Sequence, residues 1–257
     1  VMIFVDSHAH LDDEAFDEDR DQVIADILSG GNYFFNIASD LKTSYSSYEL
    51  AKKYDHVYAV VGVHPHEAKD YTAETREALK ELLKKDKVMA IGEIGLDYHY
   101  DFSPRDVQRK VFIDQIDLAR EMDVPIVIHT REAMEETYEI LEKYAQDMKV
   151  LIHCYTGSIE MARKFLKLGY KLALGGALTF KNAKNTVDVA REVDLKDLLI
   201  ETDSPYMTPV PFRGKRNDPR KVVLVAEKLA EIKGISTEEV LEATKKNAFE
   251  FFGVEND

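Results

Sequence analysis

The chain has 257 residues, of which 45% are hydrophobic, and this composition supports one large apolar core and argues against disorder. Its 34 basic and 48 acidic residues give a formal net charge of −14, which excludes an extended basic surface for long nucleic acid, so any such contact must be local. Cys154 is the only cysteine, which excludes an intrachain disulfide and a thiolate cluster that binds zinc.

The sequence contains no apolar run that approaches the roughly 20 residues needed by a membrane-spanning helix. Residues 2–5 form a short apolar run that lacks the length and the basic flank of a signal peptide. We therefore expect a cytoplasmic protein with no membrane contact and no obligate protein partner. No linker rich in Pro, Gly or Ser divides the chain, which favours a single domain over residues 1–257.

Short apolar runs of the kind that form strands alternate along the chain with segments whose apolar residues recur at helical spacing. The runs are residues 2–5, 33–37, 57–63, 88–91, 124–128, 150–152, 171–174 and 198–200. Two helices are predicted after the last run, one over 219–232 and one that starts at a capping box of Ser236 and Glu239 and ends near Phe252. Eight strands each followed by a helix predict an α/β fold, a (β/α)8 TIM barrel. An open doubly wound sheet is the alternative, but no glycine-rich dinucleotide motif follows the first run.

Polar residues stand where these apolar runs end. In a (β/α)8 barrel the active site lies at the carboxyl ends of the strands, so side chains from several strands converge there. His8 and His10 are two positions apart, and side chains at i and i+2 of a strand share a face, so both can bind one ion. The other polar residues at run ends are His64, His66, Glu93, His129, His153 and Asp203.

Imidazoles and carboxylates in this number indicate a metal centre. The candidate ligands suit zinc, manganese, cobalt, nickel or iron, and tolerate magnesium less well. Six ligands exceed the needs of one tetrahedral ion, so we expect two divalent metal ions that share a carboxylate, and Glu93 lies between the two histidine groups in strand order. The six are His8, His10, Glu93, His129, His153 and Asp203.

Each candidate also has an ordinary structural alternative. Asp203 is suited to cap the turn after the last strand, and His64, His66 and His99 are each suited to pack a loop. Cys154 follows His153 on the same predicted strand, so we expect its side chain to point away from the site and to pack as a small apolar group.

A basic segment follows the last predicted strand. Residues 211–217 carry three cations within four positions, on a strongly acidic chain. The ordinary interpretation is a solvated loop. Beside a metal centre, however, Arg213, or less favourably Arg216, could bind a phosphate through its guanidinium, while Phe212 or Tyr206 offers a surface for base stacking. Such a small patch favours strand ends or short oligonucleotides over long duplexes.

Five segments of the chain resemble, in order, the motifs of the TatD-related metal-dependent deoxyribonucleases, a family of the amidohydrolase-like barrels. The segments are residues 6–10, 62–66, 92–98, 153–157 and 201–206. The resemblance implies a (β/α)8 fold and metal-dependent phosphodiesterase activity on DNA, commonly as an exonuclease that acts from a 3′ end.

The resemblance also implies roles for individual residues. One metal would be bound by His8, His10, Glu93 and Asp203, and the second by Glu93, His129 and His153. His64 would face the substrate phosphate, with His66, Arg213 and Tyr206 as further candidate substrate contacts. The catalytic candidates are Asp203, which would orient or deprotonate the attacking water, the bridging Glu93, and His64.

Two other functions remain open from the sequence. A related barrel hydrolase that acts on an amide or a lactone would use the same metal ligands, and the basic loop argues against it. A metal-stabilised scaffold with no catalytic role is the third hypothesis, and it leaves six polar groups at a barrel mouth without chemical use.

Overall fold

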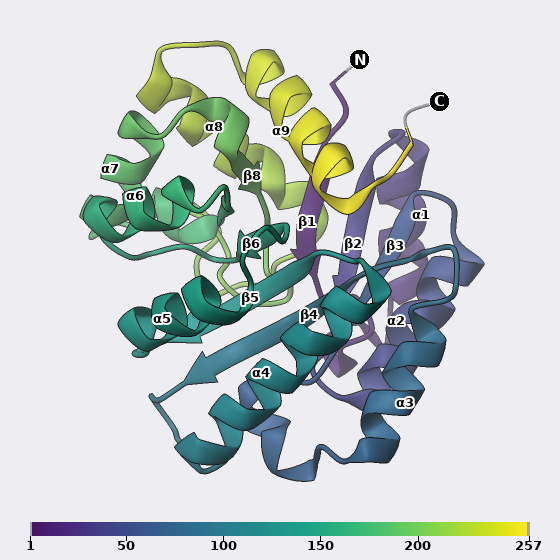
Figure 1. The fold of residues 1–257 in the computed structure, drawn as a ribbon. Coiled ribbons are helices and arrows are strands. Elements are labelled where there is room, and N and C mark those ends of the chain that lie inside the picture. The colour runs from purple at the N-terminus through teal and green to yellow at the C-terminus, as the bar shows by residue number, and fades with distance from the viewer. Residues whose placement is uncertain (1, 256–257) are drawn as a thin grey trace.

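The computed structural model describes residues 2–255, and its strands form one parallel sheet in chain order from β1 to β8 (Figure 1). Within these residues the strands are β1 Val5–Ala9, β2 Tyr33–Ile37, β3 Val57–Val61, β4 Val88–Asp97, β5 Ile126–Arg131, β6 Val150–Ile152, β7 Lys171–Leu174 and β8 Leu198–Ile200. The segment after β8 returns to β1, where the His10 amide donates to the Ser204 carbonyl at 2.9 Å. This hydrogen bond nearly closes the sheet, and the predicted (β/α)8 barrel is confirmed.

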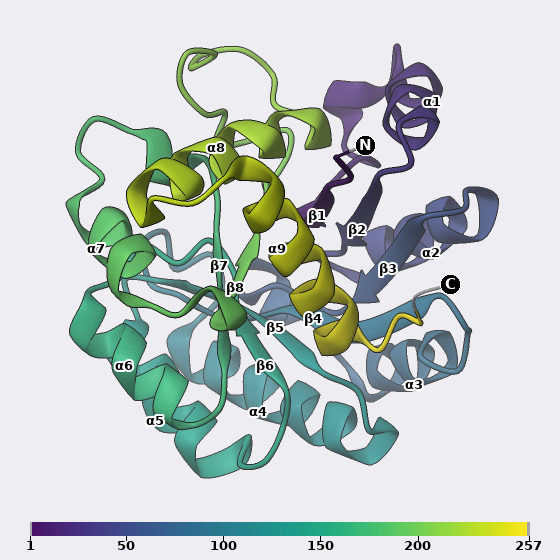
Figure 2. The ribbon, with the colours of Figure 1, turned by 90° about the horizontal axis from the view of Figure 1, so that it is seen from above.

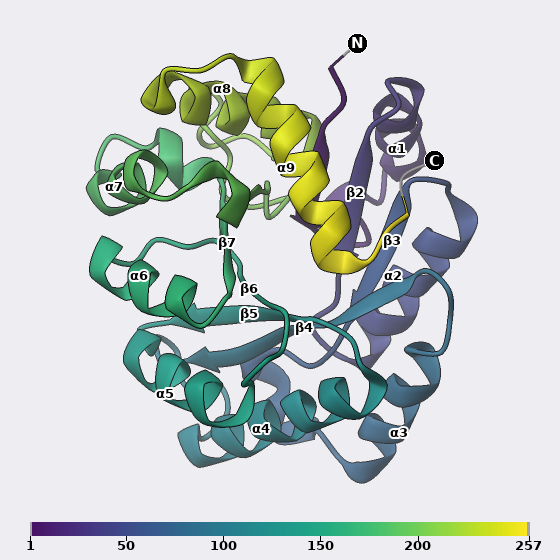
Figure 3. The ribbon, with the colours of Figure 1, turned by 45° about the horizontal axis from the view of Figure 1, so that its top comes forward.

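Helices follow the strands and surround the sheet, as Figure 3 shows. They are α1 Arg20–Ser29, α2 Leu41–Lys53, α3 Ala73–Leu82, α4 Arg105–Met122, α5 Met134–Tyr144, α6 Ile159–Lys167, α7 Lys184–Glu192, α8 Val222–Lys233 and α9 Thr237–Phe252. The predicted N-terminus of α9 is confirmed, because the Ser236 hydroxyl accepts from the Glu239 amide at 3.1 Å. None of the helices within residues 2–255 has an apolar stretch that could span a membrane.

Three strands that bear candidate ligands differ from the prediction. The fifth lies at Ile126–Arg131 rather than 124–128, so it includes His129. The first strand lies at Val5–Ala9 rather than 2–5, because polar side chains at its centre are buried and paired: the Ser7 hydroxyl donates to the Ile200 carbonyl at 2.9 Å. The fourth continues to Asp97 rather than ending at 91. Pairing with β5 extends it, and Gly95 is required there because a Cβ would lie 1.9 Å from the His129 carbonyl oxygen. His8 and Glu93 therefore lie within strands.

The amino-terminal end of the barrel is closed by α9, which crosses it in Figure 2. The Phe252 ring stacks on Phe35 of β2 with centroids 4.0 Å apart, and Phe249 packs edge-on against Tyr33 at 5.0 Å. Fully buried Val60 and Val127 belong to the same apolar cluster inside the barrel. This end is packed with hydrocarbon, so the polar residues of the strands collect at the opposite end.

Candidate metal centre

A cavity of about 810 Å³ lies at the carboxyl ends of the strands. It is lined by side chains from β4 and β5, by residues that directly follow β1 and β6, and by residues of the segment after β8. The predicted site residues that line it are His10, His64, His66, Glu93, His129, His153, Asp203 and Tyr206. His8 is fully buried beside them, with its Nε2 atom 3.4 Å from Glu93 Oε2. The barrel therefore brings all six predicted metal ligands to one place, and their role as ligands stays a prediction.

His10 and Asp203 face each other across the junction of β1 and the segment after β8. His10 Nδ1 lies 2.7 Å from the Ile37 carbonyl oxygen and must donate to it, so a neutral His10 ring presents a lone pair at Nε2. That nitrogen is 3.2 Å from Asp203 Oδ1, an acceptor. Although burial opposes it, Asp203 raises the pKa of His10 to about 9. Two acceptors in this position require a cation between them, either a proton or a metal ion.

Glu93 occupies the centre of the cluster. Its Oε1 atom is 2.9 Å from both His129 Nδ1 and His153 Nε2, and its Oε2 atom faces His8. The carboxylate is buried, which favours its neutral form, but His153, His8 and His129 together hold the pKa of Glu93 well below its usual range. An ionised carboxylate with one oxygen toward each histidine group has the arrangement of a bridging ligand.

His8 gives the clearest indication that a metal fits. Both of its ring nitrogens are buried, and neither has a hydrogen-bond partner among the residues that the structure describes. Burial and the neighbouring His153 lower the pKa of His8, so the ring is neutral and one nitrogen offers a lone pair. An unpartnered buried imidazole nitrogen is costly unless a ligand such as a divalent ion satisfies it. The donors around His8 therefore fit a metal ion.

Two carboxylates that received no role from the sequence support this cluster. Asp97 Oδ2 is 2.9 Å from His129 Nε2 and 3.1 Å from His66 Nε2. Glu201 Oε2 is 2.9 Å from His153 Nδ1. Metal-binding histidines are commonly oriented by such partners. Their spacing in the sequence could have indicated this role, because residues an even number of positions apart on a strand share a face. Asp97 is four positions after Glu93 on β4, and Glu201 is two positions before Asp203.

Three further residues considered in the sequence differ in whether they reach the metal cavity. His64 is buried, and burial lowers its pKa well below the usual value, so the ring is neutral with Nε2 3.9 Å from Glu93 Oε1. His99 does not turn inward; its Nδ1 pairs with Glu132 Oε2 at 2.5 Å on the surface. Cys154 lines the cavity, so the expectation that it points away was wrong. The backbone of Cys154 has a φ of 47°, which is not a strand conformation, so the alternation of side chains along β6 does not extend to this residue.

The predicted substrate contacts divide between two places. Tyr206 lines the metal cavity, with a half-exposed ring and a hydroxyl that donates to Asp13 Oδ2 at 3.1 Å. Arg213 lines a neighbouring pocket instead, and Arg216 is held by Asp19 through two hydrogen bonds of 2.8 and 2.7 Å. The sequence pattern gave no sign of Arg131, an exposed cation that lines the metal cavity and lies over the Tyr100 ring at 5.4 Å.

The sequence model of the family described as TatD related DNase matches residues 5–253. The chain belongs to this family. A Bacillus subtilis relative, the uncharacterized metal-dependent hydrolase YabD, is 44% identical over 98% of this chain and all of its own length. The Escherichia coli uncharacterized metal-dependent hydrolase YcfH is 38% identical over 99% of this chain and 97% of its own.

A solved structure agrees with these sequence relatives. The crystal structure of YjjV, a TatD homologue from Escherichia coli, superposes with a TM-score of 0.90 at 29% identity and covers 98% of each chain. This chain is accordingly a metal-dependent hydrolase of the TatD-related DNase family, and its clusters of histidine and carboxylate side chains are able to bind metal ions.

Proposed function

We propose that the chain hydrolyses phosphodiester bonds of DNA from the 3′ ends of single strands, and that it uses two divalent metal ions. The observation that carries this proposal is the position of Glu93, whose two carboxylate oxygens face different histidine groups. The donor groups fit one ion bound by His8, His10, Glu93 and Asp203, and a second bound by Glu93, His129 and His153. When bound, the ions would lower the pKa of a water molecule and polarise a phosphoryl oxygen.

The side chains supply the remaining chemistry. Asp203 would orient an attacking water and accept its proton, a role that suits an ionised carboxylate at the cavity wall. The hydrogen bond from His10 Nδ1 to the Ile37 carbonyl orients the ring, so that Nε2 would face the first ion beside Asp203. The neutral His64 ring lines the same cavity, with Nε2 3.9 Å from Glu93 Oε1, and would contact the substrate phosphate there. Buried Asp97 and Glu201 fix the orientation of His129 and His153.

A nucleic-acid substrate is favoured by aromatic and cationic groups at the cavity mouth. Tyr100 and Phe102 are stacked with centroids 4.9 Å apart, and their side chains are 53% and 54% exposed. An exposed aromatic pair offers a flat face on which a base can stack, and Arg131 beside it suits a phosphate. An amide or lactone substrate, the competing proposal, would make no use of this cation. Strand ends and short oligonucleotides therefore remain the proposed substrates.

The test compares three substrates on the metal-loaded full chain. Single-stranded DNA labelled at its 5′ end should shorten as a ladder from the other end, while closed circular single strands should remain intact. A panel of lactones and amides run beside them should turn over far more slowly. Rapid cutting of circles would identify an endonuclease, and preferential lactone turnover would overturn the DNA proposal.

A further inference from the structure

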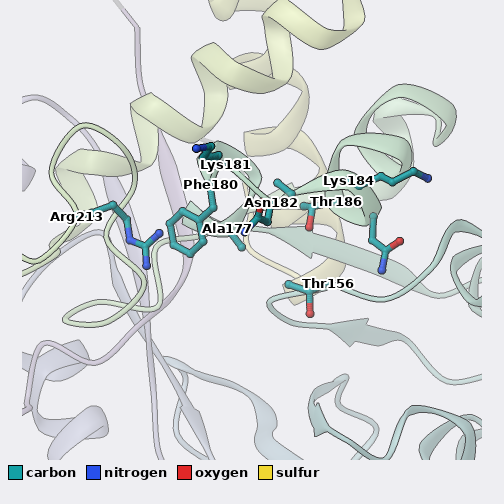
Figure 4. Close-up of a pocket in the computed structure, with 10 residues that line it drawn as sticks. Thr156, Ala177, Phe180, Lys181, Asn182, Lys184, Thr186 and Arg213 are labelled. Atoms are coloured by element: carbon teal, nitrogen blue, oxygen red, sulfur yellow. The ribbon is translucent and has the colours of Figure 1, made fainter.

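A second cavity of about 390 Å³, here called the basic pocket, adjoins the metal cavity. It is formed by the segment after β7, the start of α7 and the loop after β8, and Thr156 lines both cavities. Figure 4 shows Arg213 on one side of it with its guanidinium at the face of the Phe180 ring, and Thr156 at the opposite edge. A bound chain that left the metal cavity past Thr156 would enter this pocket.

The lining of the basic pocket is cationic on a chain of net charge −14. It includes Lys181, Lys184 and Arg213, and none of its lining residues is acidic. The Arg213 guanidinium lies 3.6 Å from the Phe180 ring centroid, and within residues 2–255 no carboxylate pairs with it or with Lys181. Lys184 alone has an acidic partner, Asp188, at 3.3 Å. Two cations thus remain available for an anion.

The first turn of α7 adds neutral donors to the same pocket. The helix begins after Ala183, which offers no capping side chain, so the amides of its first turn are open to a ligand. Thr186 in this turn is only 3% exposed, and across the described chain its hydroxyl has no hydrogen-bond partner although the residue lines the pocket. This hydroxyl is available to donate a hydrogen bond to a ligand in the pocket.

We propose that the basic pocket binds a phosphate group of the substrate strand other than the one being cut, together with part of its nucleotide. This inference rests on the proposed function, since it assumes a DNA substrate. The volume lies within the range of about 300–1,000 Å³ typical of small-molecule sites, which leaves room beyond a phosphate. The Arg213 fork can donate two parallel hydrogen bonds to phosphate oxygens, while Lys181 and the Thr186 hydroxyl bind the rest.

The test measures binding rather than turnover. Fluorescently labelled phosphorothioate strands of two and of six nucleotides are titrated with the metal-loaded full chain, and their anisotropy is recorded. The Lys181→Ala/Arg213→Ala double variant is compared with Lys110→Ala/Arg163→Ala, which removes the same two charges from exposed helix positions that line neither cavity. Unchanged thermal unfolding of both variants checks their folding.

We expect the six-nucleotide strand to bind wild type at least tenfold more tightly than the two-nucleotide strand. The pocket variant should lose most of this difference, and the control should stay within about twofold of wild type. The slope of log affinity against log salt should fall by about 0.7 for each phosphate that the variant no longer neutralises. Arg213→Lys should restore the affinity only in part, because lysine lacks the fork.

Three outcomes would overturn the inference. Equal affinity for the two strand lengths, or equal losses of affinity in the pocket and control variants, would show that no second phosphate is bound there. If wild type cleaves 5′-labelled DNA in either case, the proposed function survives and the basic pocket alone is refuted. If wild type neither binds nor cleaves DNA, both proposals fail.

Discussion

The two neighbouring cavities share Thr156 and yet have opposite chemistry. Carboxylates are concentrated in the metal cavity, and the basic pocket has none. The carboxylates that line the metal cavity are Asp12, Asp13, Glu67, Glu93, Asp97 and Asp203. The difference teaches that a strongly acidic chain can keep its charges apart locally. Under the proposed function, the carboxylates of one cavity would bind metal cations, and the cationic side chains of the other would bind a phosphate.

The sharpest way to break this comparison is Glu93→Gln. The amide keeps the shape but removes the charge that faces both histidine groups, so metal content should fall and hydrolysis should drop by roughly three orders of magnitude. Oligonucleotide binding through the basic pocket should persist. Metal analysis measures the metal content, and rate measurements follow the hydrolysis. Glu67→Gln is the matched control, because Glu67 lines the same cavity and has no ion pair within residues 2–255. A metal-replete, active Glu93→Gln protein would contradict the bridge.

A smaller effect is expected of Asp97→Asn. The amide lacks the charge of the carboxylate that pairs with His129 Nε2 at 2.9 Å, so His129 is held less firmly and metal affinity should fall by about 10–100-fold. Added metal should restore hydrolysis, because Asp97 is a positioning residue rather than a proposed ligand. Calorimetric titration with metal gives the affinity, and the binding of six-nucleotide strands should not change. A rate that stays low at saturating metal would mean that Asp97 acts in the chemistry itself.

The smallest step, about tenfold for a change of one pH unit, concerns pH. In the metal-free protein the pKa of His10 is raised to about 9, so its ring is protonated at neutral pH and a metal must displace that proton. Apparent metal affinity should therefore rise about tenfold per pH unit for each proton displaced, up to pH 9. The proton also stabilises the metal-free fold below the unfolded-state pKa of about 6.5, and this contribution is lost as pH rises through 9.

Calorimetry in buffers of different ionisation heat counts the protons released on metal binding. The midpoint of thermal unfolding of the metal-free protein, followed from pH 7 to pH 9, should decline more than that of the metal-loaded protein. A metal affinity that does not change between pH 7 and pH 9 would contradict this prediction. It would show that the His10 ring is already neutral at pH 7 and that Asp203 does not stabilise the proton on His10.

The barrel could be predicted because each strand and each helix has its own periodicity in the sequence. The convergence of the candidate ligands at one end then follows from the topology of a barrel, while their role as ligands stays a prediction. The predicted fourth strand is shorter than β4 because Gly92 and Gly95 interrupt the apolar pattern. In the structure, pairing with β5 keeps the backbone extended past these glycines. Register across strands decides which carboxylate meets which ring nitrogen. The supporting roles of Asp97 and Glu201 therefore could not be assigned from spacing alone.

The basic pocket was beyond sequence reasoning for a different reason. Arg213 was predicted to bind substrate beside the metals, but its guanidinium lies on Phe180, more than thirty positions earlier in the chain. Thr156 comes from the loop after β6, and Thr186 comes from the first turn of α7. No local pattern joins these segments, since loop paths depend on the packing of the helices between them. The role of Arg213 thus stays a prediction, in a place that only the fold reveals.

The junction between β1 and the end of β8 has a consequence for synthesis of the chain. His10 and Asp203 are separated by 193 positions, and the Asp203 amide donates to the His8 carbonyl at 2.8 Å across this junction. A nascent chain has made all the histidines of the cluster well before Asp203 leaves the ribosome. The site proposed for the first ion is therefore completed only as the barrel closes, and metal capture becomes a late event that reports a finished fold.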